Sequence, residues 1–115
     1  MTITRIEPGP RMSRAVVHGD TVYLAGHVSN DRSLGVGGQT GAILERIEQV
    51  LAAAGSHKSR ILSVTIWLAD IGTFDQMNAV YDAWVDRADP PTRATVEAKL
   101  AAPEYLVEIA CIAAR

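Results

Sequence analysis

Apolar and polar residues alternate along several short stretches of the chain, and two longer stretches repeat apolar residues at helical spacing. Alternation at every second position predicts a half-buried strand, whereas apolar residues three and four positions apart predict an amphipathic helix. The pattern predicts strands at residues 14–18, 21–28 and 61–70, and two more after Pro90 that are separated by a break at Pro103. A weaker alternation at residues 3–7 fits an edge strand.

Two helices are predicted between these strands. The first covers residues 39–54 and ends at Gly55, a residue type well suited to a helix C-terminus. The second begins at Thr73, where Thr73 and Gln76 fit a capping box, and it stops before Pro90. The expected buried stripes are Ile43, Ile47, Val50, Leu51 and Ala54 on the first helix, and Phe74, Met77, Tyr81, Trp84 and Val85 on the second.

The strand patterns also predict faces and turns. Two β-rich runs around Gly19 and Asp20 predict a hairpin. Gly26 interrupts the second run, and such a glycine marks a bulge, a place where a ligand approaches the backbone, or a packing position. In the stretch 61–70, one set of residues is expected to face the helices: Leu62, Val64, Ile66 and Leu68.

This order of elements predicts one α/β (α+β) domain over residues 1–115. We expect a two-layer sandwich with a mixed sheet of about six strands and two helices on one face. The other sheet face would then carry Tyr23, Ala25 and Trp67, which are too apolar to be left in water. We therefore expect an oligomer in which the sheets face each other around a closed symmetry axis.

Composition narrows the classes of function. The 115 residues carry a formal net charge of −2 and no basic run, which argues against a nucleic-acid partner because phosphate contacts need clustered Lys and Arg. No apolar stretch is long enough to span a membrane, and no apolar signal core opens the chain, so we expect a cytoplasmic protein. The single Cys111 fits a reducing compartment, and the three scattered histidines have no metal-ligand spacing.

Arg93 and Glu108 are the strongest candidates for chemistry, on what we expect to be neighbouring strands. Arg93 follows a rigid Pro-Pro-Thr segment, where it could hold a carboxylate in a bidentate grip or serve as a surface arginine. Glu108 shares a strand face with Ala110 and Ile112, so its carboxyl group is paired, open to water at an edge, or desolvated. A desolvated carboxyl group would suit general acid–base catalysis, whereas direct contact with Arg93 would make a structural pair.

Two other residues carry reactive groups. Cys111 lies in an apolar run with no base in sequence reach, so we expect an inert core thiol. His27 follows Gly26 and could line a cleft, although a lone histidine is more often a satisfied hydrogen-bonding residue.

Three segments together resemble one known family. They are TVYLAGHV at residues 21–28, ILSVTIWLADIGTFDQMNAVYDAW at residues 61–84, and Pro91-Thr92-Arg93 followed by VEIACIA, which places Glu108 fifteen residues after the arginine. The chain is similar over essentially its whole length to the reactive intermediate deaminase family, also called RidA/YjgF and often labelled endoribonuclease L-PSP.

The resemblance implies a homotrimer of chorismate-mutase-like subunits with sites in the clefts between subunits. It implies that Arg93 grips the carboxylate of a 2-imino acid and that Glu108 positions the hydrolytic water. Gly26 matches a backbone contact, Asn78 matches an asparagine near the site, and Thr95 stands in place of a cysteine. Met12 and Ala25 stand where the family usually has a tyrosine and a serine, which removes two hydroxyl groups from the pocket.

The implied reaction is hydrolysis of imino or enamine acids to 2-keto acids and ammonia. It needs no metal or organic cofactor. One alternative is a non-catalytic or regulatory trimer that binds small carboxylates, which would keep Arg93 and not need Glu108. An endoribonuclease is a further alternative that the net charge disfavours, and a purely structural oligomer is the last.

Overall fold

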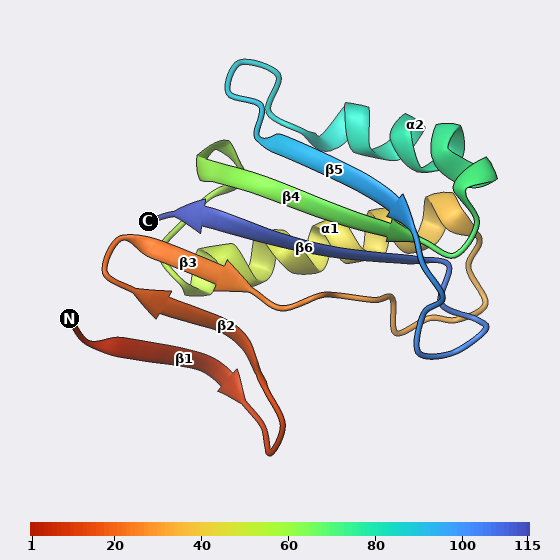
Figure 1. The fold of residues 1–115 in the computed structure, drawn as a ribbon. Helices are drawn as coiled ribbons and strands as arrows, with labels where there is room; N and C mark the ends of the chain where they lie inside the picture. Colours follow the sequence, from red (N-terminus) through yellow and green to blue (C-terminus); the bar gives the residue numbers. More distant parts are fainter.

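The computed structural model describes residues 1–115 as six strands and two α-helices (Figure 1). The helices are α1 (Val36–Ala53) and α2 (Phe74–Trp84), with short 3-10 turns at Lys58–Arg60 and Ile71–Thr73. The strands are β1 (Ile3–Pro8), β2 (Ser13–His18), β3 (Thr21–Leu24), β4 (Ile61–Leu68), β5 (Thr92–Glu97) and β6 (Val107–Ala114).

The strands form one sheet in the order β1-β2-β3-β6-β4-β5. Only β4 and β5 run parallel, because α2 lies in the connection between them and carries the chain back to the same end of the sheet. Both helices cover one face of the sheet (Figure 1). The predicted class, a two-layer α/β sandwich with a mixed sheet, is confirmed.

The core lies between this sheet face and the helices. Strand β6 alternates strictly between buried and half-buried residues, so one of its faces is fully covered. Its buried residues pair with those of β4 and lie below α1. The main-chain neighbours in this layer include Val64 with Cys111, Ile66 with Ile109, and Leu68 with Val107.

Helix α1 begins three residues earlier than its apolar stripe predicts. Its N-cap is Gly35, and Gln39, which we expected to be the first helical residue, is instead fully buried within the first turns. Gly55 follows the helix with a φ of 78°, the left-handed conformation that ends many helices. The predicted stripe is confirmed, since all five of its residues are buried: Ile43, Ile47, Val50, Leu51 and Ala54.

The prediction that Leu62 faces the helices is wrong. The side chain of Leu62 is 52% exposed, whereas Ile61 is buried. A register irregularity between Ile61 and Ser63 shifts the alternation at the start of β4, so that the buried face resumes at Val64. A single irregular residue pair therefore reverses the side on which one leucine lies.

The predicted capping box at Thr73 is also wrong. The Thr73 side chain makes no cap to α2 and instead donates a 2.6 Å hydrogen bond to the backbone oxygen of Asp70. The Asp70 carboxylate accepts a hydrogen bond from the Gly72 N–H at 2.8 Å. The Thr73 N–H, which the Gln76 side chain of a capping box would have satisfied, instead donates to the backbone oxygen of Asp70 at 3.0 Å. Met77 and Tyr81 are buried as predicted, but Phe74 is more than one third exposed.

Strand β3 is shorter than predicted, because it ends at Leu24 instead of Val28. The backbone then leaves regular pairing at Ala25 and Gly26, and it rejoins β6 through an isolated antiparallel bridge between His27 and Ile109. Gly26 therefore lies in a break in the strand, which agrees with the interpretation that this glycine marks an irregularity such as a bulge.

The second sheet face has no helix over it. Across β3, β6 and β4, Tyr23, Ile112 and Ser63 lie side by side, and Trp67 is paired with Glu108. Tyr23 is 47% exposed and Val96, next to Trp67 on β5, is equally so. We call this surface the open sheet face. Neither helix is both long and apolar enough to cross a lipid bilayer.

Candidate functional site

Arg93 lies on the helix-facing side of β5, because its neighbour in the sheet is the buried Val64. Its Nη1 donates a 2.7 Å hydrogen bond to Oδ1 of Asn78 on α2. The guanidinium carbon is 4.7 Å from the centre of the Tyr81 ring and 5.7 Å from that of Phe74. We call these four residues the arginine cluster.

The local sequence explains this cluster. Phe74, Asn78 and Tyr81 are spaced at i, i+4 and i+7, so they share one face of α2. The same face packs toward β5, which is the edge strand of the sheet. The parallel crossover from β4 through α2 to β5 therefore brings a cation, an amide and two aromatic rings together from one continuous segment.

The electrostatics of the cluster favour an anionic ligand. None of the chain's salt bridges involves Arg93, so its charge has no carboxylate partner in the subunit. Burial raises the pKa of Tyr81, while the nearby Arg93 opposes that increase. Thr95 lies one step further along the same strand face, and its buried Oγ1 has no hydrogen-bond partner within the chain. The cluster thus offers unused donors around a fixed cation.

Glu108 lies on the open sheet face, opposite to the side that carries Arg93. Its neighbour on β4 is Trp67. Gly26 sits directly against the Glu108 side chain, so closely that a Cβ at position 26 would overlap the carboxylate Oε2. We call Ala25, Gly26 and Glu108 the glutamate cluster. No salt bridge of the chain involves Glu108.

The expectation that Arg93 and Glu108 lie on neighbouring strands is wrong. Strand β4 separates β5 from β6, and the two side chains point to opposite faces of the sheet. The β4 neighbours of Arg93 and Glu108 are Val64 and Trp67, three residues apart, which adds roughly 10 Å along the strand. One subunit therefore holds the two residues apart, and the alternative of a structural ion pair within the chain is excluded.

Met12 is part of neither cluster. It lies in the connection between β1 and β2 and is 50% exposed. The shallow hollow next to it is lined only by residues of the same hairpin, among them Glu7 and Arg14.

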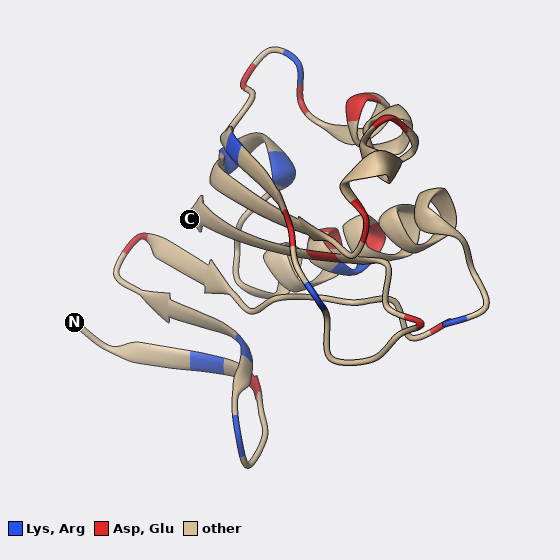
Figure 2. Cartoon of the chain, turned by 45° about the vertical axis from the view of Figure 1, so that its right-hand side comes forward, with Lys and Arg blue, Asp and Glu red and all other residues tan.

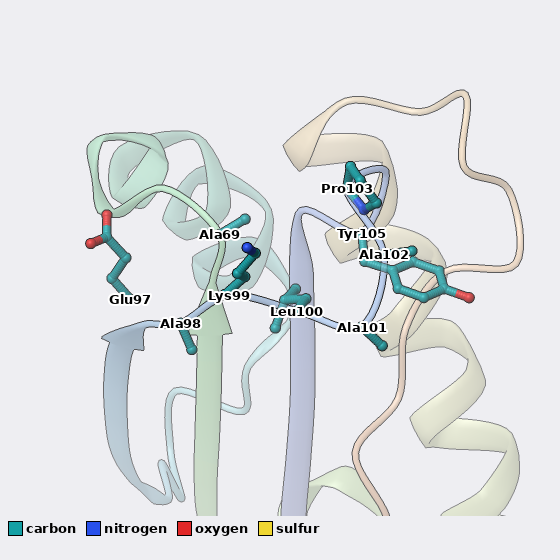
Figure 3. A pocket seen from close by; sticks show the side chains of 9 residues that line it. All are labelled: Ala69, Glu97, Ala98, Lys99, Leu100, Ala101, Ala102, Pro103 and Tyr105. Atoms are coloured by element: carbon teal, nitrogen blue, oxygen red, sulfur yellow. The ribbon is translucent and has the colours of Figure 1, made fainter.

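The largest cavity, of about 520 Å³, lies elsewhere, at the carboxyl ends of β4 and β5 (Figure 3). Its lining consists of Ala69 and the segment that follows β5, including Lys99, Leu100 and Tyr105. None of the residues predicted for the site contributes to it. No group of three or more His, Cys, Asp or Glu side chains in the chain could hold a metal ion.

Sequence reasoning missed two parts of the site. Phe74 and Tyr81 were assigned to the buried stripe of α2, although their spacing from Asn78 also placed them beside any ligand-binding residue on that face. His27 was expected either to line a cleft or to be a satisfied hydrogen-bonding residue, and its almost complete burial next to Gly26 was not predicted. A histidine that follows a strand-interrupting glycine was the available signal.

Comparison with known proteins now adds to this geometry. The family model described as Endoribonuclease L-PSP matches residues 2–115. The chain belongs to this family, which is also named RidA/YjgF or RutC. It is 46% identical over 114 residues to a RutC family protein of Haemophilus influenzae, with 98% of both chains covered. It is 44% identical to the RutC family protein YoaB of Escherichia coli, with 99% of each covered.

Solved structures of the L-PSP family have the same fold. A YjgF family member from Neisseria meningitidis superimposes with a TM-score of 0.95 at 39% identity, covering 100% of this chain and 96% of the other. A protein from Pseudomonas aeruginosa gives a TM-score of 0.96 at 38% identity, with 99% of both chains covered. These likenesses extend over the strands that carry both clusters.

The family name Endoribonuclease L-PSP refers to RNA, so the distribution of charged residues is of interest. Positions of Lys and Arg are spread over many elements and are interleaved with Asp and Glu (Figure 2). No helix or strand presents a row of cations of the kind that tracks a phosphate backbone.

Proposed function

We propose that this chain is a hydrolytic deaminase that converts reactive 2-imino and enamine acids to 2-keto acids and ammonia. The observation that carries the proposal is the arginine cluster. Its guanidinium is held by Asn78 and two rings, and it has no carboxylate partner in the chain. A guanidinium has five N–H donors in a fork that fits a carboxylate, so most of them remain for a substrate.

The proposed active unit is a homotrimer in which each site is shared by two subunits. The arginine cluster of one subunit would face the glutamate cluster of its neighbour. Two features support this assembly. Arg93 and Glu108 are on opposite faces of one sheet, and the open sheet face exposes aromatic and aliphatic side chains that water does not favour.

The proposed reaction balances as imine plus water giving ketone and ammonia. Arg93 binds the substrate carboxylate and fixes C2 beside Glu108 of the neighbouring subunit. The Glu108 carboxylate accepts a proton as the water oxygen forms a bond to C2, and this proton passes to the nitrogen to give a carbinolamine. The hydroxyl proton of the carbinolamine then moves to the nitrogen, the C–N bond breaks as the C=O bond forms, and ammonia leaves. Orientation and proton transfer are the whole contribution, so we expect no metal or organic cofactor.

The other predicted residues have supporting roles in this proposal. Gly26 lets the backbone approach Glu108, and Ala25 forms the wall beside it. The Thr95 hydroxyl, which lacks a partner in the chain, would donate to the substrate or to a water. Because Met12 belongs to neither cluster of its own subunit, it would contribute to a site only by contact with a neighbouring subunit. We expect the protein to act in the cytoplasm on a small imino or keto acid, without nucleic acid or membrane.

An assay with a chemical trap tests the proposal. A pyridoxal-phosphate dehydratase generates 2-iminopropanoate in solution, and semicarbazide captures the imine that has not been hydrolysed. We expect the wild-type protein to suppress semicarbazone formation and to release ammonia. The Arg93→Ala variant should lose this effect, because the substrate carboxylate would have no cation. Arg87→Ala is a matched control, since Arg87 bonds only to the backbone oxygen of Asp82.

Three outcomes would contradict parts of the proposal. If the wild-type protein does not suppress semicarbazone formation, the proposal that it deaminates 2-iminopropanoate is wrong. If wild type binds 2-ketobutanoate by calorimetry without any rate effect, the chain is a non-catalytic carboxylate binder. Full activity in Arg93→Ala would show that the carboxylate is held elsewhere.

A further inference from the structure

His27 occupies an unusual place beside the glutamate cluster. Its residue is only 3% exposed, and its Nδ1 lies 2.7 Å from the backbone oxygen of Ala25. A carbonyl oxygen can only accept, so Nδ1 must carry the hydrogen. The other ring nitrogen, Nε2, is then a bare acceptor, and it is buried without a hydrogen-bond partner within the chain.

The backbone of His27 is fixed at the same time. Its N–H donates to the oxygen of Ile109 at 2.8 Å, and the N–H of Ile109 donates to the oxygen of His27 at 3.0 Å. Ile109 directly follows Glu108 on β6. These two bonds tie His27 to the residue next to the glutamate, on a stretch where β3 has already ended.

These hydrogen bonds flank Gly26. The His27 ring bonds to the carbonyl of Ala25, which precedes Gly26, and the His27 backbone pairs with Ile109 of β6. The Gly26 Cα thereby lies against the Glu108 side chain, so that a Cβ at position 26 would require the carboxylate to move. The bend at residues 25–27 lacks regular strand pairing beyond the His27–Ile109 bridge. The Ala25 N–H donates to the backbone oxygen of Arg14 at 2.9 Å, and the His27 ring adds the side-chain hydrogen bond within the bend.

We propose that His27 is a positioning residue for Glu108. Through the Nδ1–H bond to Ala25 it fixes the bend at Gly26, and the bend fixes the rotamer of the Glu108 side chain that lies against it. The effect on deamination rests on the proposed function, but the effect on Glu108 itself does not. His27 would touch neither substrate nor water.

The charges around His27 agree with a neutral ring. Burial lowers the pKa of His27 below its ordinary value, and the hydrogen bond to Ala25 opposes that decrease. The nearby charged groups on the packed elements are Arg14 of β2 and Arg46 of α1, which lower the pKa of His27, and Glu7 of β1, which raises it. Near pH 7 the ring therefore keeps one hydrogen, on Nδ1, as the positioning bond requires.

Nitrogen NMR tests the assignment of that hydrogen. In protein labelled with 15N at histidine, we expect His27 to show the Nδ1–H tautomer at pH 7, with a protonated Nδ1 and an unprotonated Nε2. An Nε2–H tautomer would overturn the proposal, since Nδ1 would then have no hydrogen to donate to Ala25. This measurement needs no substrate.

Two substitutions separate positioning from packing. His27→Leu keeps the apolar volume but has no donor, whereas His27→Asn places an amide N–H where Nδ1 lies. We expect the 13C carboxyl signal of Glu108 to move in His27→Leu and to return toward wild type in His27→Asn. His18→Leu, on the exposed end of β2, is the matched control and should leave that signal in place.

The kinetic consequences are specific. In His27→Leu we expect kcat to fall by about tenfold, the loss of one buried hydrogen bond, while KM changes by less than about twofold because Arg93 still holds the carboxylate. His27→Asn should recover most of kcat. A wild-type Glu108 signal in a folded His27→Leu variant would overturn the proposal whatever the activity. Inactive wild-type protein with a shifted Glu108 signal in His27→Leu would instead reject only the deaminase function.

Discussion

Asn78 and Arg93 are joined by a 2.7 Å hydrogen bond between the amide oxygen of one and the guanidinium of the other. The amide holds the planar fork against the rings of Phe74 and Tyr81, so that its orientation does not depend on a ligand. In Asn78→Ala the charge of Arg93 remains, but no hydrogen bond fixes the orientation of its guanidinium group. We expect the Kd for 2-ketobutanoate to rise by at least about tenfold, because a hydrogen bond to a charged group contributes about 1.5–3 kcal/mol. Isothermal titration calorimetry measures this, and an unchanged Kd would show that the rings alone orient Arg93.

A side chain at position 26 would force the Glu108 carboxylate to move. In Gly26→Ala the new methyl group would overlap this carboxylate and displace it, and because the carboxylate ends a flexible side chain, the folding free energy should change by less than about 1 kcal/mol. We expect a nearly unchanged melting temperature but at least a tenfold loss of kcat. Gly35→Ala is the control, since nothing lies within 4 Å of a Cβ at that position. Equal kcat values for Gly26→Ala and wild type would mean that Glu108 can act from another rotamer.

The open sheet face should be the assembly surface. Wild-type protein should have three times the 12.3 kDa chain mass in light scattering. Ile112→Lys puts a charge beside Tyr23 on this face and should yield monomers with little deaminase activity. Ala52→Lys, on the exposed side of α1, should remain trimeric. A wild-type mass of a single chain would refute the shared site.

Gln39 should be among the most sensitive polar residues. It is fully buried, and its amide donates to the backbone oxygens of Leu34 and Glu104 at 3.0 and 2.9 Å while its oxygen accepts from the Leu106 N–H at 2.9 Å. Gln39→Leu leaves three backbone groups without partners, and we expect the free energy of unfolding to fall by about 3 kcal/mol or more. The same change at the exposed Gln49 should cost less than about 0.5 kcal/mol. Chemical denaturation compares the two variants, and similar midpoints would contradict the anchoring role.

Cys111 should be unreactive while the protein is folded. Burial raises the pKa of its thiol to about 12, whereas an unfolded cysteine titrates near 8.5. The folded state therefore holds its proton in a range where the unfolded state has lost it. This contribution to stability is complete below about pH 8.5 and is lost as the pH rises toward 12. We expect a thiol reagent at pH 8 to label the protein only after denaturation, and Cys111→Ala to weaken the alkaline decline in melting temperature. Rapid labelling of native protein would contradict this.

Much of the fold could be predicted because periodicity reports burial directly. The stripe of α1 and the alternation of β6 each bury one set of residues against the other layer, and both came out as the sequence indicated. Leu62 failed for a local reason, since an irregular pair at one strand end reverses the alternation without leaving a mark in residue type. The capping-box prediction at Thr73 failed because Asp70, three residues earlier, supplied a competing acceptor for the Thr73 hydroxyl.

The candidate site was harder to predict than the fold. Residue types and spacing singled out Arg93 and Glu108, but which face each one occupies depends on strand order. The strand order places β4 between β5 and β6. No feature of the sequence after Pro90 predicts this order. Helical spacing placed Phe74, Asn78 and Tyr81 on one face of α2, but it did not predict the contact of Asn78 with Arg93. The contact between Gly26 and Glu108 was equally hidden, because it joins segments far apart in the chain.

The continuity of the arginine cluster has a practical consequence. All four of its residues lie between positions 74 and 93, within one strand–helix–strand unit bounded by β4 and β5. The glutamate cluster instead forms only when β6 has paired alongside the segment after β3. Under the proposed function, exchange of residues 61–97 between relatives should transfer the preference for the anionic ligand. The proposed water-positioning residue Glu108 should not be transferable in this way, because its surroundings require pairing between segments that are far apart in the chain.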